Sequence, residues 1–256
     1  MVADPLLLAS AGLVGLCFGS FLNVCILRLP NDLSLLKPTS SCPKCRHTIG
    51  WRDNIPVLSW LLLKGRCRWC REPISPQYPV VEALVGGLWL AAVLAYGVSL
   101  AALAAAAFGT ILLGIGITDA RHYLIPDEYT WGGLVLGLAL SLGDGADGFL
   151  RAVLGAAVGF ALLYAVAQAG RWVFREEAMG GGDVKMMAMV GAFVGWKGVL
   201  LTVFLGALLG SLVFIPLSVK KKRLVPFGVF LALGAAITFV AGDAIISWYL
   251  HFLRGD

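Results

Sequence analysis

The chain has 256 residues, of which 59% are hydrophobic and only 14% charged, and its mean hydropathy is +0.86. A soluble domain carries about 25% charged residues, so this composition excludes an ordinary soluble enzyme, a disordered chain and a secreted disulfide scaffold. The net charge of +5 does not indicate nucleic-acid binding, because the charged residues cluster between apolar runs and not on a water-facing surface.

Apolar segments follow one another along the chain, and each is expected to cross a membrane as a helix. A crossing helix needs about 20 apolar residues, so two of the segments, 129–142 and 185–196, are short and must begin inside the membrane or be shielded by neighbours. The first segment is long and lacks a preceding basic region, so we do not expect a cleaved signal peptide. The sequence therefore predicts an all-α integral membrane protein with about eight transmembrane helices. The eight segments are 6–27, 79–97, 100–118, 129–142, 149–170, 185–196, 198–219 and 225–250.

The distribution of lysine and arginine predicts the orientation of these helices. If the N-terminus lies outside and all eight segments cross, seventeen of the twenty Lys and Arg residues fall on the cytoplasmic side. The cluster at 220–223 decides the short segment 185–196, because this cluster would face outside if that segment did not cross. We therefore expect both termini outside and the long loop between the first two helices in the cytoplasm.

This long polar loop, about 28–78, contains two Cys-x-x-Cys pairs, Cys42 with Cys45 and Cys67 with Cys70, separated by 21 residues. The spacing is typical of a four-cysteine zinc site in which each pair forms a tight turn. Thiols stay reduced in the cytoplasm, which favours a metal over the alternatives of disulfides or free thiols. Such a site has no open coordination position, so we expect the zinc to fold the loop and not to take part in bond chemistry.

Carboxylates near or within membrane spans are candidates for function. Asp119 ends the third segment, and Asp183 follows three glycines just before the short sixth segment. Both fall at the cytoplasmic side of the predicted topology, which favours a proton-sharing pair with aspartyl-protease chemistry. Gly180 and Gly182 would let an extended substrate approach. The alternatives are a water-facing helix end for Asp119 and a bare turn for the glycines.

Four further charged residues lie within or beside these segments. Glu82 lies inside the second segment, where it needs a proton-sharing neighbour, a substrate contact or a basic partner. Asp127 and Glu128 follow a proline and are expected to cap the fourth helix. Lys185 lies two residues past Asp183, where it either binds an anion, tunes the aspartate or extends to the membrane interface.

Six motifs, in order along the chain, resemble those of the type IV prepilin peptidases, also called leader peptidase/N-methyltransferases, which are GxGD aspartyl proteases of the bacterial inner membrane. The motifs are Phe18-Gly-Ser-Phe-Leu-Asn23 with Arg28-Leu-Pro30, the cysteine loop with Trp51-Arg-Asp-Asn-Ile-Pro56, Ile74-Ser-Pro-Gln-Tyr78-Pro-Val-Val-Glu82, the Asp119 stretch, Gly180-x-Gly182-Asp183, and Pro226-Phe-Gly-Val-Phe.

The resemblance implies that Asp119 and Asp183 cleave the basic leader of prepilins and pseudopilins after a glycine. It also implies methylation of the new N-terminal residue with S-adenosylmethionine. The methyltransferase part would be 1–97, including Asn23 and the cysteine loop, and the peptidase core 98–256. The residues alone do not reveal the methyl-donor site, because no glycine-rich loop follows a strand. Glu82, Asn23, Gly180, Gly182 and Lys185 are expected to support the sites.

Two other classes of protein share some of these features. A transporter or proton channel also uses intramembrane carboxylates and glycine-broken helices, but the sequence has no convincing internal repeat. A membrane-anchored redox module would need accessible thiols of low pKa.

Overall fold

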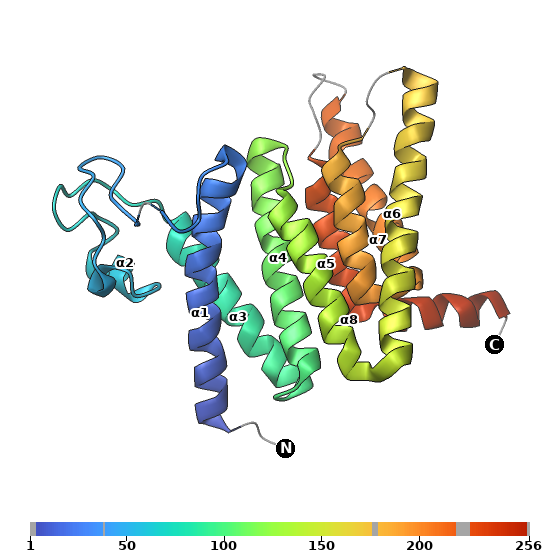
Figure 1. The fold of residues 1–256 in the computed structure, drawn as a ribbon, viewed down its shortest axis with the longest axis horizontal. Helices are drawn as coiled ribbons and strands as arrows, with labels where there is room; N and C mark the ends of the chain where they lie inside the picture. The colour runs from blue at the N-terminus through green and yellow to red at the C-terminus, as the bar shows by residue number, and fades with distance from the viewer. Residues whose placement is uncertain (1–3, 38, 176–178, 219–225, 255–256) are drawn as a thin grey trace. The chain divides into compact units, whose positions relative to one another are not determined.

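The computed structural model is helical and describes residues 4–37, 39–175, 179–218 and 226–254 (Figure 1). The described residues contain no β-strand, only two isolated β-bridges. A short helix, α2, and three 3₁₀ turns, η1 to η3, lie between the long helices. The elements are α1 (Pro5–Arg28), η1 (Leu29–Asn31), η2 (Trp51–Asp53), α2 (Leu58–Leu62), α3 (Gln77–Tyr96), α4 (Leu100–His122), α5 (Asp127–Ser141), η3 (Leu142–Asp144), α6 (Gly145–Phe174), α7 (Gly181–Ser218) and α8 (Phe227–Arg254).

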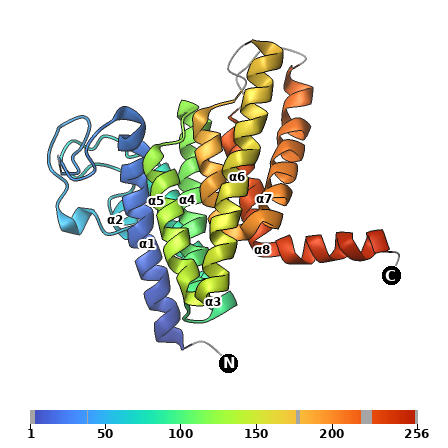
Figure 2. The ribbon, with the colours of Figure 1, turned by 45° about the vertical axis from the view of Figure 1, so that its right-hand side comes forward.

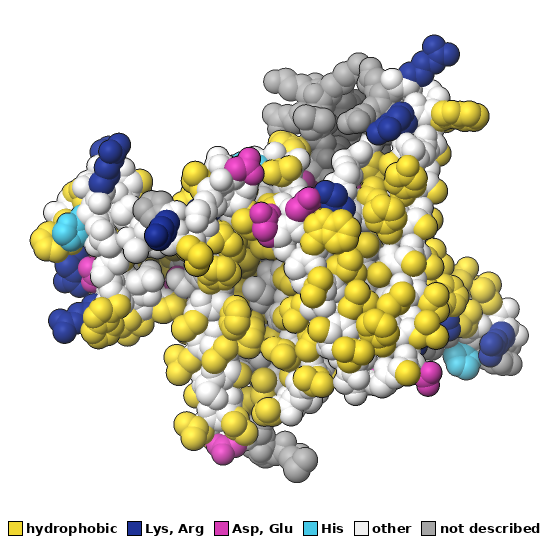
Figure 3. All heavy atoms as spheres, viewed as in Figure 1, with side chains coloured by type: hydrophobic (Ala, Val, Ile, Leu, Met, Phe, Trp, Pro, Cys, Tyr) yellow, Lys and Arg dark blue, Asp and Glu magenta, His cyan; other side chains and the backbone are white. Residues whose placement is uncertain are grey.

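Within the described ranges, six helical segments are long and apolar enough to cross a membrane. The number is six and not eight because α5 and α6 are joined through η3 into one segment, and because α7 contains both of the predicted segments 185–196 and 198–219. Hydrophobic side chains predominate on the face of the helices that Figure 3 shows. The prediction of an all-α integral membrane protein is confirmed, and each predicted segment forms helix. The basic cluster at 220–223 lies outside the described residues.

The chain forms two compact units, Met1–Thr110 and Ile111–Asp256, which we call unit 1 and unit 2. In unit 1, α1 begins where the Asp4 side chain accepts a hydrogen bond from the Leu6 N–H and Pro5 takes the first helical position. The helix α1 packs closely on α3, since a Cβ atom at Gly19 would lie only 2.6 Å from the Cα of Glu82. This close approach places the polar residues of α1 against the start of α3.

Unit 2 is a bundle in which α7 folds back on itself. Gly195 has φ 67° and ψ 176°, a conformation open to glycine but strained for other residues, and it interrupts the helix. The first half of α7 runs parallel to α5 and antiparallel to α6, whereas the second half runs antiparallel to α8. Figure 2 shows both ends of α7 on one side of the unit. The pairs that define these directions are Gly133 with Met189, Gly137 with Phe193, Gly155 with Gly191, Gly159 with Met187, Gly198 with Thr238, and Gly206 with Leu231.

The reversal at Gly195 explains how a short segment crosses. About 14 residues precede it in α7, which span about 21 Å at 1.5 Å per residue. This length is less than a bilayer core, and its side chains are shielded by α5 and α6: Met186, Met187 and Met189 are fully buried. The first half of α7 is therefore a short helix shielded by its neighbours, which is one of the two alternatives expected for the segment 185–196.

Candidate active site and metal site

Asp119 lies in unit 2, one turn before the end of α4, and only 5% of it is exposed. Its Oδ2 accepts a hydrogen bond of 3.1 Å from the N–H of Val229, the third residue of α8. The first N–H groups of a helix have no carbonyl partner four residues earlier within the helix. The Val229 N–H is therefore shared between the Asp119 carboxylate and the Pro226 carbonyl, which lies 3.3 Å away. Gly228 permits the approach, because a Cβ there would lie 2.9 Å from the same Oδ2.

Asp183 is the third residue of α7 and is partly buried. Its N–H donates to the Gly180 carbonyl at 3.2 Å, which closes the glycine turn. A Cβ at Gly182 would lie 3.0 Å from the Cβ of Ile125, so the turn packs directly on this residue. The glycine turn therefore has no room for a side chain at its third position.

The two aspartates are brought together by the chain that follows α4. This helix ends where Tyr123 takes a positive φ of 54° and donates its N–H to the Asp119 carbonyl. The next residues return over the bundle, so that Ile125 contacts both the glycine turn of α7 and Gly228 of α8. Asp119 and Asp183 consequently lie close enough to interact electrostatically. The structure thus places two acidic side chains, from α4 and α7, at one end of unit 2.

Lys185 and Asp127 form an ion pair, and Lys185 lies two residues from Asp183 in the sequence. The Lys185 Nζ lies 2.7 Å from both carboxylate oxygens of Asp127. Asp127 occupies the first turn of α5, where a negative charge is favourable, but α5 has no capping hydrogen bond from a side chain of the described residues. The expectation of a cap is wrong in this respect, because the carboxylate is bound by the lysine instead. Sequence reasoning missed this pair, which joins positions 58 residues apart.

In unit 1, Glu82 is 7% exposed and its Oε2 accepts a 2.7 Å hydrogen bond from the Val57 N–H. The Ser20 side chain of α1 also hydrogen-bonds to Glu82. One turn away, the Asn23 Nδ2 donates to the Tyr78 carbonyl at 3.0 Å. The sequence predicted an acidic, basic or substrate partner for Glu82, whereas its protein partners are a backbone amide and a hydroxyl. No local signal marks these partners, because the bonds depend on helix packing.

The four loop cysteines gather in one place, with all four Sγ atoms within 4.8 Å of one another. The Sγ atoms of Cys42 and Cys70 are 3.7 Å apart, and those of Cys45 and Cys67 are 4.0 Å apart. All four are free thiols in the structure. The set can supply four sulfur ligands to one metal ion, so the prediction of a metal-binding cluster is confirmed.

Each cysteine pair lies in a turn of the same form. The first cysteine of each pair accepts, at its carbonyl, the N–H of the residue four positions later, and that residue has a positive φ. In the first turn this residue is Arg46, with φ 56°, and in the second it is Arg71, with φ 60°. The repeated geometry points both pairs of sulfurs toward one centre.

The thiols differ in acidity. Backbone N–H groups of Cys45 and Lys44 lower the pKa of Cys42 to about 7. The Glu72 N–H acts on Cys70 in the same direction, but burial and the neighbouring thiols outweigh it and raise the pKa of Cys70 to about 11. Ionisation of one thiol therefore makes ionisation of a second less favourable. A divalent cation bound between the two thiolates would remove their repulsion.

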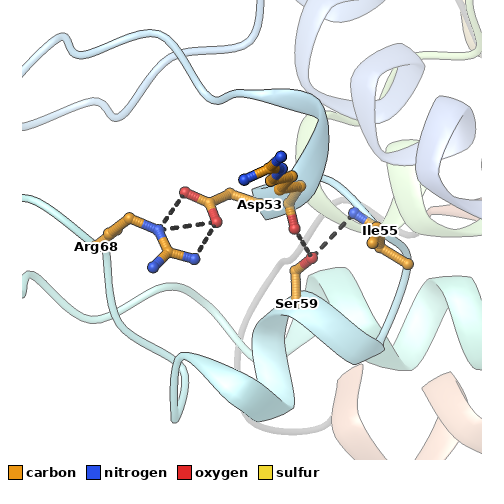
Figure 4. Close-up of polar contacts among 5 residues, drawn as sticks. Asp53, Ile55, Ser59 and Arg68 are labelled. Atoms are coloured by element: carbon orange, nitrogen blue, oxygen red, sulfur yellow. Dashed lines mark hydrogen bonds and ion pairs between the residues drawn. The ribbon is translucent and has the colours of Figure 1, made fainter.

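Ionic and polar contacts stabilise the cysteine loop. Both carboxylate oxygens of Asp53 accept hydrogen bonds from the Arg68 guanidinium, at 2.5 to 2.9 Å, as Figure 4 shows. These bonds lower the pKa of Asp53. The Ser59 hydroxyl links the same turn to α2 by donating to the Arg52 carbonyl and accepting from the Ile55 N–H. These contacts therefore connect the turn before α2 both to α2 and to the second cysteine pair, in which Arg68 lies.

Comparison with known proteins identifies the family. Residues 13–96 match the Bacterial Peptidase A24 N-terminal domain, and residues 106–215 match the Type IV leader peptidase family. A prepilin leader peptidase/N-methyltransferase of Myxococcus xanthus is 39% identical over 87% of this chain and 66% of its own length. Proteins of the same name from Aeromonas hydrophila and Bacillus subtilis are 36% and 34% identical, over 93% and 94% of this chain and 92% and 97% of theirs. No solved structure matches the chain.

The chain therefore belongs to the type IV leader peptidase family, and the resemblance seen in the six motifs is confirmed.

Proposed function

We propose that this chain is a prepilin leader peptidase that cleaves the basic leader of prepilins and pseudopilins after a glycine, and then methylates the new N-terminal residue. The names of its relatives support both activities. The observation that carries the cleavage is the meeting of Asp119 and Asp183, from α4 and α7, beside the first N–H groups of α8.

In the proposed cleavage, one aspartate removes a proton from water, and the water oxygen attacks the scissile carbonyl carbon. The other aspartate, initially protonated, donates its proton to the carbonyl oxygen. Collapse of the tetrahedral intermediate breaks the C–N bond, and the leaving amine takes up a proton. The Val229 N–H holds the Asp119 carboxylate in position. The glycine turn leaves room for an extended substrate backbone at Gly181, where an added Cβ would meet nothing within 4 Å, whereas Gly182 packs on Ile125.

The proposed orientation places the cysteine loop and both aspartates on the cytoplasmic side of the bacterial inner membrane, with both termini outside. The excess of Lys and Arg in the loop and at one side of the helices supports this orientation. A substrate with an apolar helix in the bilayer and a basic leader in the cytoplasm would then present its scissile bond at the depth of the aspartates.

We also propose that the metal of the loop is zinc, held by Cys42, Cys45, Cys67 and Cys70. Four closely placed thiols without an oxygen ligand suit Zn²⁺. The ion would fold the loop and take no part in bond chemistry. The methyl donor is S-adenosylmethionine, and methyl transfer belongs to 1–97, with the peptidase core in 98–256.

The substitutions Asp119→Asn and Asp183→Asn test the proposed peptidase. Each keeps the size of the side chain but removes the acid, so we expect leader cleavage to fall by about 10³-fold or more. Methylation of a pre-cleaved substrate is expected to survive. The matched control is Asp243→Asn, at an exposed aspartate in the second half of α8. Cleavage at the normal rate by both variants would show that the two aspartates are structural.

A further inference from the structure

A second cluster of polar groups lies in unit 1, where α1 packs on α3. We call it the α1–α3 seam and define it by Ser20, Asn23 and Glu82. Asn23 is 3% exposed and Glu82 is 7% exposed. The backbones meet closely here, because Gly19 packs on the Cα of Glu82. These side chains are therefore enclosed by two helices and by the loop that carries Val57.

In the α1–α3 seam, the hydrogen-bond acceptors outnumber the donors that the described residues supply. Glu82 receives bonds from a backbone amide and a hydroxyl, and it forms no ion pair with any residue that the structure describes. The Asn23 Oδ1 is buried and has no donor among the described residues. Buried charges are ordinarily paired and buried acceptors ordinarily hydrogen-bonded. The seam thus offers a carboxyl group without a basic partner and a buried amide oxygen without a donor among the described residues.

A group that carries a positive charge and donates hydrogen bonds would satisfy both the carboxyl group and the amide oxygen. A primary ammonium carries one positive charge and three N–H donors, enough for the free positions of Glu82 and for the Asn23 Oδ1. A sulfonium is also cationic but has no N–H, so it would leave the asparagine oxygen unsatisfied. The balance of donors and charge therefore favours an ammonium.

The loop over Glu82 is held in a strained conformation. Val57 has φ 59° and ψ −51°, and the Leu58 N–H donates to the Pro56 carbonyl at 2.5 Å, which forms a γ-turn. A positive φ is unfavourable for a β-branched residue, and the Val57 N–H is bonded to Glu82. Release of this one hydrogen bond would let the turn relax and uncover the carboxylate.

We propose that Ser20, Asn23 and Glu82 bind the N-terminal ammonium of the cleaved substrate, and that Glu82 is the base that prepares this amine for methyl transfer. This inference rests on the proposed function, whose methylation step needs such an amine. The ammonium transfers one proton to the Glu82 carboxylate. The freed nitrogen lone pair then forms a bond to the methyl carbon of S-adenosylmethionine, the C–S bond breaks, and its electron pair stays on sulfur as a thioether.

The same chemistry could also recognise a lysine ammonium in the leader, so the experiment separates the two sources. A lysine of the leader is bound before cleavage, whereas the N-terminal amine exists only after it. A role in leader recognition would raise the KM of cleavage when Glu82 is neutralised, and a role in methyl transfer would leave cleavage unchanged.

The main variant is Glu82→Gln in the full chain, which keeps an oxygen to accept the Val57 N–H but removes the charge. We expect cleavage within about twofold of the unsubstituted protein and methylation of a pre-cleaved substrate lower by about 10²- to 10⁴-fold, the usual contribution of a general base. The residual rate should rise about tenfold per pH unit up to the ordinary pKa of an α-amino group, about 8. Asp147→Asn, an exposed aspartate in α6, is the charge-matched control.

The pH profile is interpretable because the partners of Glu82 do not titrate in this range. The Val57 amide and the Ser20 hydroxyl keep their protons, and the other ionisable side chains of the two packed helices are few. They are Tyr78 and Tyr96 on α3, and Cys17, Cys25 and Arg28 on α1.

Binding without any methyl donor gives a second readout. The probe is an apolar peptide with a free N-terminal phenylalanine, compared with the same peptide after N-acetylation. We expect the free amine to bind at least about tenfold more tightly, and Glu82→Gln to abolish the difference. Asn23→Leu should also reduce it, because the substitution removes the buried Oδ1 that would accept a hydrogen bond from the amine.

Normal methylation by Glu82→Gln, or equal binding of the free and acetylated peptides, would overturn the amine site. Loss of both activities together with loss of bound zinc would also overturn it, because Glu82 would then only attach the loop. A higher KM of cleavage would assign the ammonium to the leader instead. If the unsubstituted protein discriminates the peptides but methylates no substrate, the methyltransferase part of the proposed function fails while the amine site stands.

Discussion

The carboxylate of Asp119 depends on two small features of its neighbour α8. The Val229 N–H, in the first turn of α8, donates to one of its oxygens, and Gly228 leaves the space in which that oxygen lies. The glycine turn before Asp183 also depends on the absence of a side chain, because Gly182 packs directly on Ile125. At the scale of single residues, the candidate site is therefore set by backbone groups and missing side chains as much as by the acids.

The substitution Gly228→Ala tests this dependence. Its Cβ would lie 2.9 Å from the Asp119 Oδ2 and 2.7 Å from the Ile125 Cδ1, so the carboxylate or the start of α8 must move. We expect kcat for leader cleavage to fall by about 10- to 100-fold, since small misplacements of catalytic groups are costly. The control is Gly116→Ala, one turn before Asp119, where an added Cβ meets nothing within 4 Å. Equal activity of the two variants would show that the space at Gly228 does not position the carboxylate.

Asp53 gives a prediction for pH. Hydrogen bonds from Arg68 lower its pKa in the folded loop, so its contribution to stability is fully present above the unfolded pKa of about 3.9. The contribution is lost as the pH falls through the lower, folded pKa. Asp53→Asn is therefore expected to destabilise the protein by a constant amount above about pH 5, and by progressively less at lower pH. Denaturant titrations at several pH values measure this difference, and a difference that grows in acid would contradict it.

At the scale of elements, α7 is the helix whose course matters most for the site. Its first turn carries Asp183, and its first half is a short helix. Gly195 sets that length by reversing the chain, and the second half of α7 then packs along α8, which begins beside Asp119. The turn thus links the position of one aspartate to that of the helix contacting the other.

Gly195→Ala is expected to destabilise the protein by about 1–3 kcal/mol, because its φ of 67° and ψ of 176° are sparsely populated by other residues. An added Cβ would meet nothing within 4 Å, so the effect comes from the backbone alone. Thermal unfolding in detergent measures the change. Gly132→Ala on α5, also free of contacts but helical, is the control and should not be destabilised.

At the scale of the whole molecule, the proposed topology has consequences that a labelling experiment can check. Single cysteines at Ser34 and Ser247, in a variant without other cysteines outside the metal cluster, should react differently with a membrane-impermeant maleimide added to intact cells. Ser34 lies in the loop after α1, and Ser247 in the last turns of α8. We expect labelling at position 247 and protection at position 34 until the membrane is opened. The reverse pattern would invert the orientation, and with it the side on which leaders are cut.

The metal cluster and the aspartate pair show how much of the structure can be predicted from local sequence. Two Cys-x-x-Cys turns predict their own geometry, because each is built from neighbouring residues, and the spacing between them suffices to bring the turns together. The apolar segments were equally predictable, since the need for about 20 apolar residues is a property of composition. Even the short segment before Gly195 was visible, because the charge distribution requires it to cross.

The sequence by itself therefore determined the apolar helices, the clustering of the four cysteines and the family. Only the tertiary structure decided which groups lie against the candidate site residues: the Val229 amide at Asp119, the Val57 amide at Glu82, and Lys185 at Asp127. Those partners are 25 to 110 residues apart. Composition and periodicity record how each helix forms, whereas a hydrogen bond between helices depends on their rotation and depth, which close glycine packing sets.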